Sequence, residues 1–473
     1  MRFCAITLGC KVNQYETQAI EGILSARGHE RALPGEGCDV CIINTCAVTA
    51  ESVRKSRRAV RYMKKLEPGS LIAVCGCFSQ LDPEAAKQLG ADFVGGSGGR
   101  GEFALLLENK LLEFGIRDSE FGISNTAELS ESAVDAYDYH EGMDMSGASV
   151  HSELRIRNSE FELLPVGGET GRTRALLKIQ DGCDNFCAYC IIPFARGRSR
   201  SLPIHYAAEN ASRLEAEGFR EIVVTGIEIS SYGIDLQSAP SLIDLILEVS
   251  AAAPKTRIRL GSLDPGAITQ NFCEELALIP NLCDHFHLSL QSGCDETLSR
   301  MGRRYGTSTV MDAVSSLRRQ FGNCGITADL IVGFPGETEE EFEQSLSFIK
   351  TAAFSGMHIF PFSTRPGTRA ASFPDQIEKS IKIERARIAA ETTADMANHF
   401  MLRQIGKTLT VLFETERSGL WFGHSSNYLE VAVEEAVGKN SLCPVLVTGV
   451  GNGHLVGNAE CGIIIDAHVG NVE

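Results

Sequence analysis

A short segment of the 473-residue chain holds three cysteines, Cys183, Cys187 and Cys190, in the spacing C-x3-C-x2-C; we call them the barrel triad. Structural metal sites usually take four protein ligands, so a set of three leaves one metal position without a side chain. Three thiolates on one loop suit three irons of a four-iron, four-sulfur (4Fe-4S) cluster, whose fourth iron can bind a small ligand. The other interpretations are a zinc site completed from elsewhere and cysteines that are merely buried. The spacing and the loop position favour the cluster.

A second set of three cysteines is spread over the first hundred residues. Four apolar runs there have the length of buried strands and alternate with helix-like stretches: FCAITLGC, DVCIINTC, LIAVCGC and ADFVGG. This pattern predicts parallel strands with crossover helices. Three of the runs end in Cys10, Cys46 and Cys77, which we call the N-terminal triad. Because ligands of open parallel sheets lie beyond the carboxyl ends of the strands, the sequence predicts that these three thiols meet.

Three neighbouring cysteines have a less certain place in this pattern. Cys4 and Cys41 fall near the start of a predicted strand and within another, so we expect both to pack in the core. Cys75 is separated from Cys77 by Gly76 alone, and strand alternation would put both side chains on the same face. Spacing therefore does not choose between Cys75 and Cys77 as the third ligand.

Residues 172–404 repeat the alternation of strand and helix. The expected strands are ALLKIQ, EIVVTG, RIRLGS, HFHLSL, TADLIVGF and MHIFPF. Six strands are fewer than the eight of a closed parallel barrel, so we expect a partial (β/α)6 barrel that is open on one side. Cys183 follows the first strand, Gly226 the second, and Ser289 and Gln291 close the fourth. All lie at the strand ends where such barrels carry their active sites.

Two further segments complete the expected organisation of this α/β protein. Residues 117–171 are rich in acidic residues without helical or strand periodicity, which predicts a linker or a surface insertion. Residues 405–470 hold short alternating strands broken by Gly and Asn, which predicts a small β-barrel of a kind that often binds oligonucleotides. With an N-terminal sheet domain over residues 1–116, we expect three folded domains and one linker.

Charge and hydropathy limit the partners. The formal net charge of −17 argues against indiscriminate binding of nucleic acid. Residues 51–69 nevertheless concentrate seven Lys and Arg on a predicted helix, which is either a solvated face or an RNA-contacting face. No apolar run approaches the ~18 residues of a membrane span, and the first residues lack a secretory signal. Sixteen cysteines in so long a chain indicate a reducing compartment, so we expect a cytoplasmic protein without membrane contact.

These motifs resemble those of a known superfamily. C-x3-C-x2-C after a first barrel strand, with Tyr189 just before the last cysteine, is similar to the signature of radical S-adenosylmethionine (radical SAM) enzymes. With TLGCKVNQYE, NTCAVT and GCFSQ in the N-terminal domain and a small C-terminal barrel of the TRAM type, the chain resembles the methylthiotransferases over almost its whole length. GCFSQ matches the family's third cysteine motif at Cys77, so the resemblance favours Cys77 over Cys75.

The resemblance implies two 4Fe-4S clusters and S-adenosylmethionine as cofactors. The cluster of the barrel triad would bind and reductively cleave S-adenosylmethionine to a 5′-deoxyadenosyl radical, and the cluster of the N-terminal triad would bind or supply sulfur. Tyr189, Gly226, Ser289 and Gln291 are the expected contacts to S-adenosylmethionine. A reducing electron donor and a sulfur source are the implied partners, beside the substrate.

Within the family, the motifs look most like those of enzymes that modify N6-threonylcarbamoyladenosine in tRNA, including KVNQY at 11–15 and RSRS at 198–201. The implied reaction inserts sulfur at adenine C2, next to the anticodon, and a second S-adenosylmethionine methylates it. Arg196, Arg198 and Arg200 follow the cluster loop and are candidates for binding RNA phosphate, the cofactor carboxylate or the threonyl carboxylate. A flexible basic loop is the plainer alternative.

Two rival functions stay open on the sequence. One is the same chemistry on isopentenyl-adenosine in tRNA or on a ribosomal protein. The other is a non-catalytic iron–sulfur protein that binds RNA or transfers electrons. This last function predicts closed clusters with four protein ligands, whereas both triads stop at three.

Overall fold

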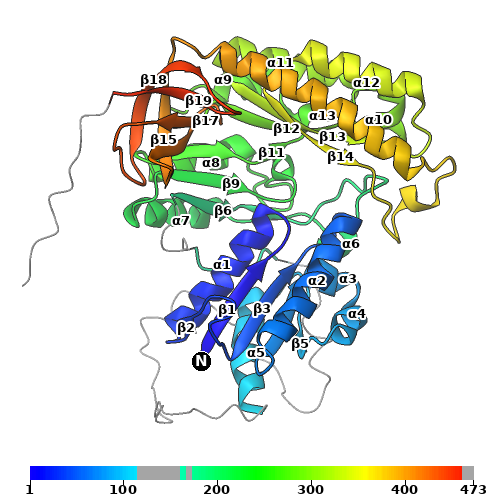
Figure 1. The fold of residues 1–473 in the computed structure, drawn as a ribbon, viewed down its shortest axis with the longest axis vertical. Helices are drawn as coiled ribbons and strands as arrows, with labels where there is room; N and C mark the ends of the chain where they lie inside the picture. Colours follow the sequence, from blue (N-terminus) through cyan, green and yellow to red (C-terminus); the bar gives the residue numbers. More distant parts are fainter. Residues whose placement is uncertain (114–159, 167–172, 461–473) are drawn as a thin grey trace, which may run out of the picture.

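The computed structural model describes residues 1–113, 160–166 and 173–460 (Figure 1). Its N-terminal part is a five-stranded sheet of order β2-β1-β3-β4-β5, in which all pairs are parallel. The strands are β1 (Arg2–Thr7), β2 (Glu30–Arg31), β3 (Val40–Thr45), β4 (Leu71–Gly76) and β5 (Phe93–Val94). The helices between and after them are α1 (Lys11–Ala26), α2 (Ala50–Leu66), α3 (Cys77–Leu81), α4 (Pro83–Gln88) and α5 (Arg100–Glu113). The predicted parallel sheet with crossover helices is confirmed.

Helices cover both faces of this sheet because the strands are apolar on both sides. On one face, Ile20 and Leu24 of α1 and Phe103 of α5 pack against Phe3 and Ile42. The opposite face packs against α2, α3 and α4, through residues such as Val60, Met63, Phe78 and Ala86. Fully buried strands of this kind read as continuous apolar runs rather than as alternating ones.

The central part contains the six expected strands, the third of which is divided into β10 and β11. They are paired in parallel and hydrogen-bonded as two sheets of order β10-β9-β6 and β11-β12-β13-β14. An isolated bridge between Ile258 and Leu282 connects the two sheets. The strands are β6 (Arg174–Lys178), β9 (Glu221–Thr225), β10 (Arg257–Leu260), β11 (Ser262–Leu263), β12 (His285–Gln291), β13 (Gly325–Val332) and β14 (Gly356–Pro361). The larger helices are α7 (Ile204–Ala216), α8 (Leu242–Ala252), α9 (Gln270–Leu276), α10 (Asp295–Met301), α11 (Thr307–Phe321), α12 (Glu339–Ala352) and α13 (Lys379–Leu402).

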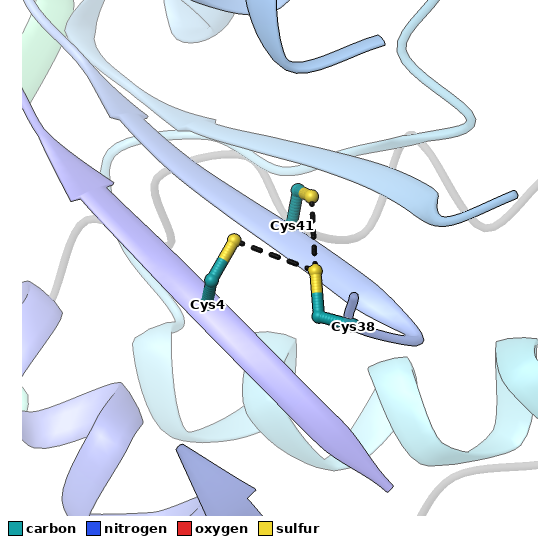
Figure 2. A group of neighbouring side chains, drawn as sticks. All are labelled: Cys4, Cys38 and Cys41. Carbon is teal, nitrogen blue, oxygen red and sulfur yellow. Dashed lines mark hydrogen bonds between the residues drawn. The ribbon is translucent and has the colours of Figure 1, made fainter. Parts of the chain in front are cut away.

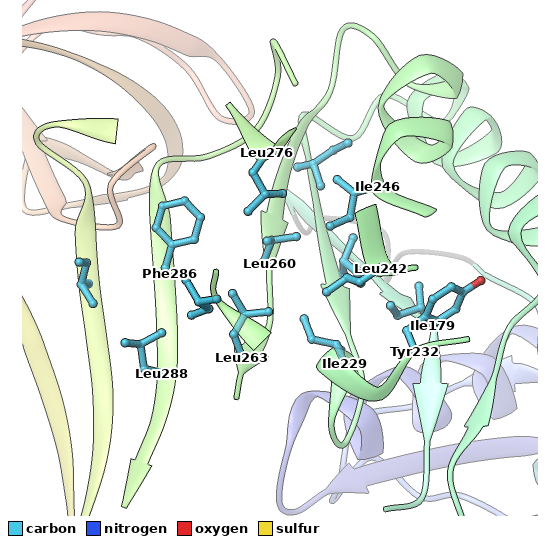
Figure 3. Packing of buried hydrophobic residues seen from close by; sticks show 14 of the residues in the cluster. Ile179, Ile229, Tyr232, Leu242, Ile246, Leu260, Leu263, Leu276, Phe286 and Leu288 are labelled. Carbon is cyan, nitrogen blue, oxygen red and sulfur yellow. The ribbon is translucent and has the colours of Figure 1, made fainter. Parts of the chain in front are cut away.

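One continuous hydrophobic core holds these strands against their helices. Figure 3 shows part of it, where Leu260 and Phe286 from the strands face Leu276 and Ile246 from the helices. Residues of β13 alternate between buried and partly buried positions. The buried residues of β13, Ile326 through Val332 at every second position, belong to this core. The other face of the strands is thereby left for polar side chains.

The chain ends in a small closed barrel of order β15-β16-β17-β19-β18, at the place where the sequence predicts one. Its strands are β15 (Thr408–Arg417), β16 (Leu420–Ser425), β17 (Glu430–Val433), β18 (Leu442–Val450) and β19 (Leu455–Ala459). The barrel docks on the central part through Tyr428, whose ring stacks on His285 at 4.6 Å and lies 4.7 Å from the guanidinium of Arg259. Arg259 also donates to the backbone carbonyls of Ser425 and Ser426.

Most of the predicted acidic linker, 117–171, lies outside the described residues, as does the end of the predicted 405–470 segment. Among the helices that the structure describes, none is long and apolar enough to cross a membrane.

Candidate active site

The barrel triad lies on a loop that a small hairpin closes. Strands β7 (Gln180–Asp181) and β8 (Arg200–Ser201) pair antiparallel on either side of the loop, and the Cys183 amide donates to the carbonyl of Gly197 at 3.1 Å. Gly182 has φ +72°, and a Cβ there would lie 1.9 Å from the backbone oxygen of Arg198. Only glycine fits this position, so the residue before the first cysteine sets the shape of the loop.

Two N–H donors point at the sulfurs of the barrel triad. The amide of Asn185 lies 3.5 Å from Sγ of Cys183, and Nη1 of Arg303 lies 3.3 Å from Sγ of Cys187. Such donors stabilise metal-bound thiolates and tune iron–sulfur clusters. Burial raises the pKa of Cys183 to about 11 and that of Cys190 to about 12, so both thiols keep their protons until a metal displaces them. The donor set therefore fits a 4Fe-4S cluster with one iron free of protein.

The N-terminal triad comes from three loops at the carboxyl ends of β1, β3 and β4. Gly9 and Gly76, each directly before a cysteine, have φ +108° and +106°. A Cβ on Gly9 would lie 2.8 Å from Cβ of Cys46, and one on Gly76 would lie 2.3 Å from the backbone oxygen of Thr45. These glycines let the chain turn from strand to helix within a few residues, so that Cys10 is the N-cap of α1 and Cys77 is the first residue of α3. The charges of Cys10 and Cys46 both act on Cys77, whose pKa burial raises to about 12.

Cys75 and Cys77 do not share a face, contrary to the expectation from strand alternation. Cys75 ends the apolar run of β4 and belongs to the core beneath α1 and α5. Cys77 belongs to the opposite core, with Phe78 and Ala195. Alternation fails here because Gly76 leaves the strand conformation and α3 begins at Cys77. This geometry places Cys77, rather than Cys75, beside Cys10 and Cys46.

Arg196 belongs to a buried network whose other charged members, Glu16, Arg100 and Lys178, the sequence did not single out. Nη1 of Arg196 lies 2.8 Å from Oε1 of Glu16, and Nη2 lies 2.6 Å from Oδ1 of Asn13. Asn13 donates in turn to the backbone oxygens of Leu8 and Thr45. Glu16 also pairs with buried Arg100 and Lys178. The loop of one triad is thereby tied to the loops of the other.

This network changes the interpretation of the three arginines after the cluster loop. Arg196 is 1% exposed and pairs with Glu16 and Asp181, so RNA does not reach it in this conformation. Arg200 is also buried and donates to the carbonyls of Arg196 and Arg198. Arg198 alone is exposed, where it pairs with Asp184 and lies 5.2 Å from the Phe186 ring.

Two of the predicted cofactor contacts, Ser289 and Tyr189, lie near Arg303. Besides Cys187, Arg303 contacts the carbonyl of Ser289 at 3.4 Å and Oδ2 of Asp264 at 2.9 Å. Neither Arg303 nor Asp264 carries a signal in the sequence: Asp264 directly follows β11, and Arg303 lies in the loop after α10. The Tyr189 ring meets Phe334 edge-on at 6.5 Å.

Three further residues lie at or just after the ends of β9 and β12. Gly226 has no room for a side chain, because a Cβ would lie 2.9 Å from Ile229 and 3.0 Å from Gln180. Gln291 has φ +68°, an unusual conformation for a residue with a side chain. Glu228 is buried, and burial together with the charge of Asp264 raises its pKa to about 7. Its carboxyl group is therefore poised between both protonation states near neutral pH.

Comparisons with known proteins show which family this chain belongs to. Residues 2–96 fit the uncharacterized protein family UPF0004, and residues 177–349 fit the radical SAM superfamily. A threonylcarbamoyladenosine tRNA methylthiotransferase MtaB of Bacillus subtilis (strain 168) is 34% identical over 94% of this chain and 93% of its own length. The chain belongs to the radical SAM methylthiotransferase family. It is an enzyme, and membership of the radical SAM superfamily implies a 4Fe-4S cluster and S-adenosylmethionine as cofactors.

Other relatives extend the comparison. A tRNA-2-methylthio-N(6)-dimethylallyladenosine synthase of Pelotomaculum thermopropionicum is 31% identical over 96% of this chain and 97% of its own length. Among solved structures, the radical S-adenosylmethionine methyltransferase TsrM from Kitasatospora setae, with cobalamin and a 4Fe-4S cluster bound, has a TM-score of 0.51. That match covers 89% of this chain and 80% of TsrM at 15% identity, which shows a shared fold only.

Proposed function

We propose that this enzyme converts N6-threonylcarbamoyladenosine, next to the anticodon of a tRNA, to its 2-methylthio derivative. The observation that carries the proposal is the pair of three-cysteine sites joined by the buried contact between Arg196 and Glu16. When bound, a 4Fe-4S cluster with S-adenosylmethionine at the barrel triad supplies the radical chemistry, and a second cluster at the N-terminal triad supplies the sulfur. The proposed tRNA substrate also places the enzyme in the cytoplasm.

The residues of the chain have three tasks in this reaction. Arg303 and Asp264 hold the cofactor region around Cys187 by hydrogen bonds. The network of Arg196 and Glu16 fixes the two sites relative to each other. Cys46, Cys77, Cys183 and Cys187 are buried, which limits the access of water and protects a reactive intermediate from side reactions. The proposed domains are the N-terminal domain over 1–116, the radical SAM core over 172–404 and a TRAM-like RNA-binding barrel over 405–470.

A positive site beside Cys46 favours the threonylcarbamoyl group over an uncharged substituent. Arg365 lies close enough to Cys46 and Arg57 for their charges to act on it, and burial lowers its pKa. Its buried Nε has no hydrogen-bond partner among the described residues. A carboxylate would satisfy that donor and relieve the repulsion from Arg57. The threonyl carboxylate has the right charge for this position, whereas a dimethylallyl group has none.

The RNA backbone would lie on exposed basic side chains near both sites. The seven cations of α2 are all exposed: Arg54, Lys55, Arg57, Arg58, Arg61, Lys64 and Lys65. The N-terminus of α2 contacts the central part, because the amide of Ala50 donates to Oγ of Ser363 at 2.8 Å. The cations in the first turns of α2, such as Arg54 and Arg57, therefore lie on the side of the N-terminal triad, whereas Lys64 and Lys65 lie in its last turn, at the far end. Exposed Arg198 adds one cation near the barrel triad.

The decisive experiment is mass spectrometry of tRNA nucleosides from a strain that lacks this enzyme. The proposal expects loss of 2-methylthio-N6-threonylcarbamoyladenosine and its return when the gene is restored. If 2-methylthio-N6-isopentenyladenosine disappears instead, the substrate is the dimethylallyl nucleoside. If neither nucleoside changes and a ribosomal protein loses a methylthio group, tRNA is not the substrate.

Arg365→Gln tests the carboxylate site, with Arg369→Gln as a matched control. Arg369 stands four residues further on, is exposed and donates to the carbonyl of Phe186. We expect the Arg365 variant to raise KM for threonylcarbamoyladenosine-containing tRNA about tenfold or more, the usual loss of one charged hydrogen bond. An unchanged KM would remove the threonyl carboxylate from this position.

A further inference from the structure

Three cysteines outside both triads meet at one point of the N-terminal domain. Sγ of Cys38 lies 3.5 Å from Sγ of Cys4 and 3.3 Å from Sγ of Cys41, as Figure 2 shows. All three sulfurs lie within 4.8 Å of one another. The sequence predicted Cys4 and Cys41 as core residues and gave Cys38 no role. Cys4 and Cys41 are buried as predicted. Together with partly exposed Cys38, however, they form a group of three thiols rather than separate apolar contacts.

This group lies at the opposite end of the sheet from the N-terminal triad. Cys4 of β1 and Cys41 of β3 are direct neighbours in the parallel register, and Cys38 comes from the turn before β3. Cys46 follows the other end of β3, five residues after Cys41, which is roughly 16 Å along an extended strand. One metal centre cannot therefore use both sets of cysteines.

The surroundings of the three thiols suit a cation. Ser70 places its Oγ 3.6 Å from Sγ of Cys38 and donates to the Cys38 carbonyl. The group lies close to Glu67 at the C-cap of α2, whose charge acts on Cys4. The C-terminus of a helix carries partial negative charge, which favours a nearby cation. Cys38 is partly exposed while Cys4 and Cys41 are buried, so an ion can enter from one side.

We propose that Cys4, Cys38 and Cys41 bind a single thiophilic divalent ion, Zn²⁺, as a site separate from both iron–sulfur clusters. Sulfurs this close together suit three ligands of one ion, whereas ligands of a 4Fe-4S cluster bind different irons. Zn²⁺ takes four ligands, and the Ser70 hydroxyl or a water completes the set. The ion ties β1 to the turn before β3 and to the segment after α2.

The three thiols are hydrogen-bonded to one another, since Cys38 donates to Cys4 and pairs with Cys41. Metal ions bind the thiolate form of cysteine, so a bound ion displaces thiol protons and its affinity rises with pH.

Cobalt binding to the full-length protein tests the proposal. The protein is purified without oxygen, both iron–sulfur sites are reconstituted, and Co²⁺ is added while the cobalt–thiolate absorption is followed. We expect one Co²⁺ per chain, displaced by Zn²⁺, with iron and sulfide content unchanged. Cys38→Ser should weaken binding by more than the 10–100-fold that loss of an outer hydrogen-bond partner costs. Cys273→Ser, which removes a buried cysteine on α9, is the matched control and should bind as the parent does.

Three outcomes would overturn the site. One is equal cobalt–thiolate absorption in the Cys38→Ser variant and in the parent, which would place the ion elsewhere. Another is no such absorption in the parent although free-thiol counting shows Cys4, Cys38 and Cys41 reduced. A disulfide of Cys38 with Cys4 or Cys41 in the oxygen-free protein, detected by peptide mass spectrometry, would also exclude a metal site. None of these results depends on methylthiotransferase activity, so they leave the proposed function untouched.

Discussion

Arg196 donates from Nη1 to Oε1 of Glu16 at 2.8 Å, and both side chains are fully buried. Arg196 ends the short helix α6 (Ile192–Arg196) after the barrel triad, and Glu16 lies on α1, which begins right after Cys10. Burial alone would raise the pKa of Glu16, but the charges of Arg196, Lys178 and Arg100 lower it well below its usual range. Glu16 is therefore ionised at neutral pH and needs these cations to stay buried.

Arg196→Ala should destabilise the contact between the two cysteine sites. Removing one partner of a buried ion pair typically costs about 3–5 kcal/mol, because the remaining charge is left without compensation. We expect a clearly lower midpoint in thermal unfolding and increased proteolysis at the contact of the N-terminal and central parts. Arg198→Ala is the control: its partner Asp184 is exposed, and exposed pairs contribute about 0–1 kcal/mol. Equal midpoints for the two variants would contradict the structural role of Arg196.

Arg303→Gln should lower the reduction potential of the barrel cluster. Reduction adds negative charge, and the guanidinium 3.3 Å from Sγ of Cys187 stabilises that charge. Without it, the cluster should accept an electron at a more negative potential in a redox titration followed by electron paramagnetic resonance. Arg304→Gln removes the neighbouring, exposed arginine and should leave the potential unchanged. If both variants keep the parent's potential, Arg303 does not tune the cluster.

Asp329, His287 and His358 form a polar group on the central strands, and the stability of the fold should depend on pH through their contacts. Asp329 of β13 contacts His287 of β12 at 3.3 Å and His358 of β14 at 3.1 Å. Burial alone would raise the pKa of Asp329, but the two histidines hold it at about 2, and the hydrogen bond to Asp329 raises the pKa of His358. The ionised Asp329 stabilises the folded state, and this contribution is lost as pH falls toward 2. The protonated His358 also stabilises the folded state, and its contribution is lost as pH rises through its raised pKa.

Asp329→Asn should therefore move the pKa of His358 down toward 6.5, because the acceptor loses its charge. Histidine proton signals in a pH titration by nuclear magnetic resonance measure this shift. His454 in the C-terminal barrel lies outside this group and serves as the internal reference. A His358 pKa that stays raised in the variant would mean that Asp329 is not its cause.

Patterns local in sequence predicted much of this protein. Continuous apolar runs identified the parallel strands, since strands covered on both faces exclude polar residues. The C-x3-C-x2-C loop could be predicted as a cluster site because its three cysteines are close along the chain. The rule that ligands gather at the carboxyl ends of parallel strands was enough to select Cys10 and Cys46.

What the sequence could not supply depends on contacts between distant residues. Arg196 appeared as one of three similar arginines, and only its burial against Glu16, 180 positions away, separates it from exposed Arg198. Cys38 had no visible role because its partners come from two neighbouring strands. Strand alternation predicted that Cys77 lies on the same face as Cys75, which is wrong because a positive φ at Gly76 ends the alternation of β4. The sequence pattern around Gly76 does not predict that angle.

The two cysteines around Gly76 give a sharp test of the N-terminal triad. If Cys77 is the third ligand, Cys77→Ala should lose the sulfur-supplying cluster and all methylthio product. Release of 5′-deoxyadenosine should continue, because the barrel triad lies on the central part and keeps its own ligands. Iron and sulfide counts together with nucleoside mass spectrometry measure both effects. Cys187→Ala should instead remove a ligand of the barrel triad, and release of 5′-deoxyadenosine should then be abolished.

Cys75→Ala is the matched control for Cys77→Ala. Cys75 packs in the core beneath α1 and α5, away from Cys10 and Cys46, so its loss should leave the cluster intact. The expected cost is about 1 kcal/mol of unfolding free energy, because one small buried side chain is shortened. Product formation should stay close to that of the parent enzyme. If product disappears in the Cys75 variant and persists in the Cys77 variant, the ligand is Cys75, and α3 must begin differently when the cluster is bound.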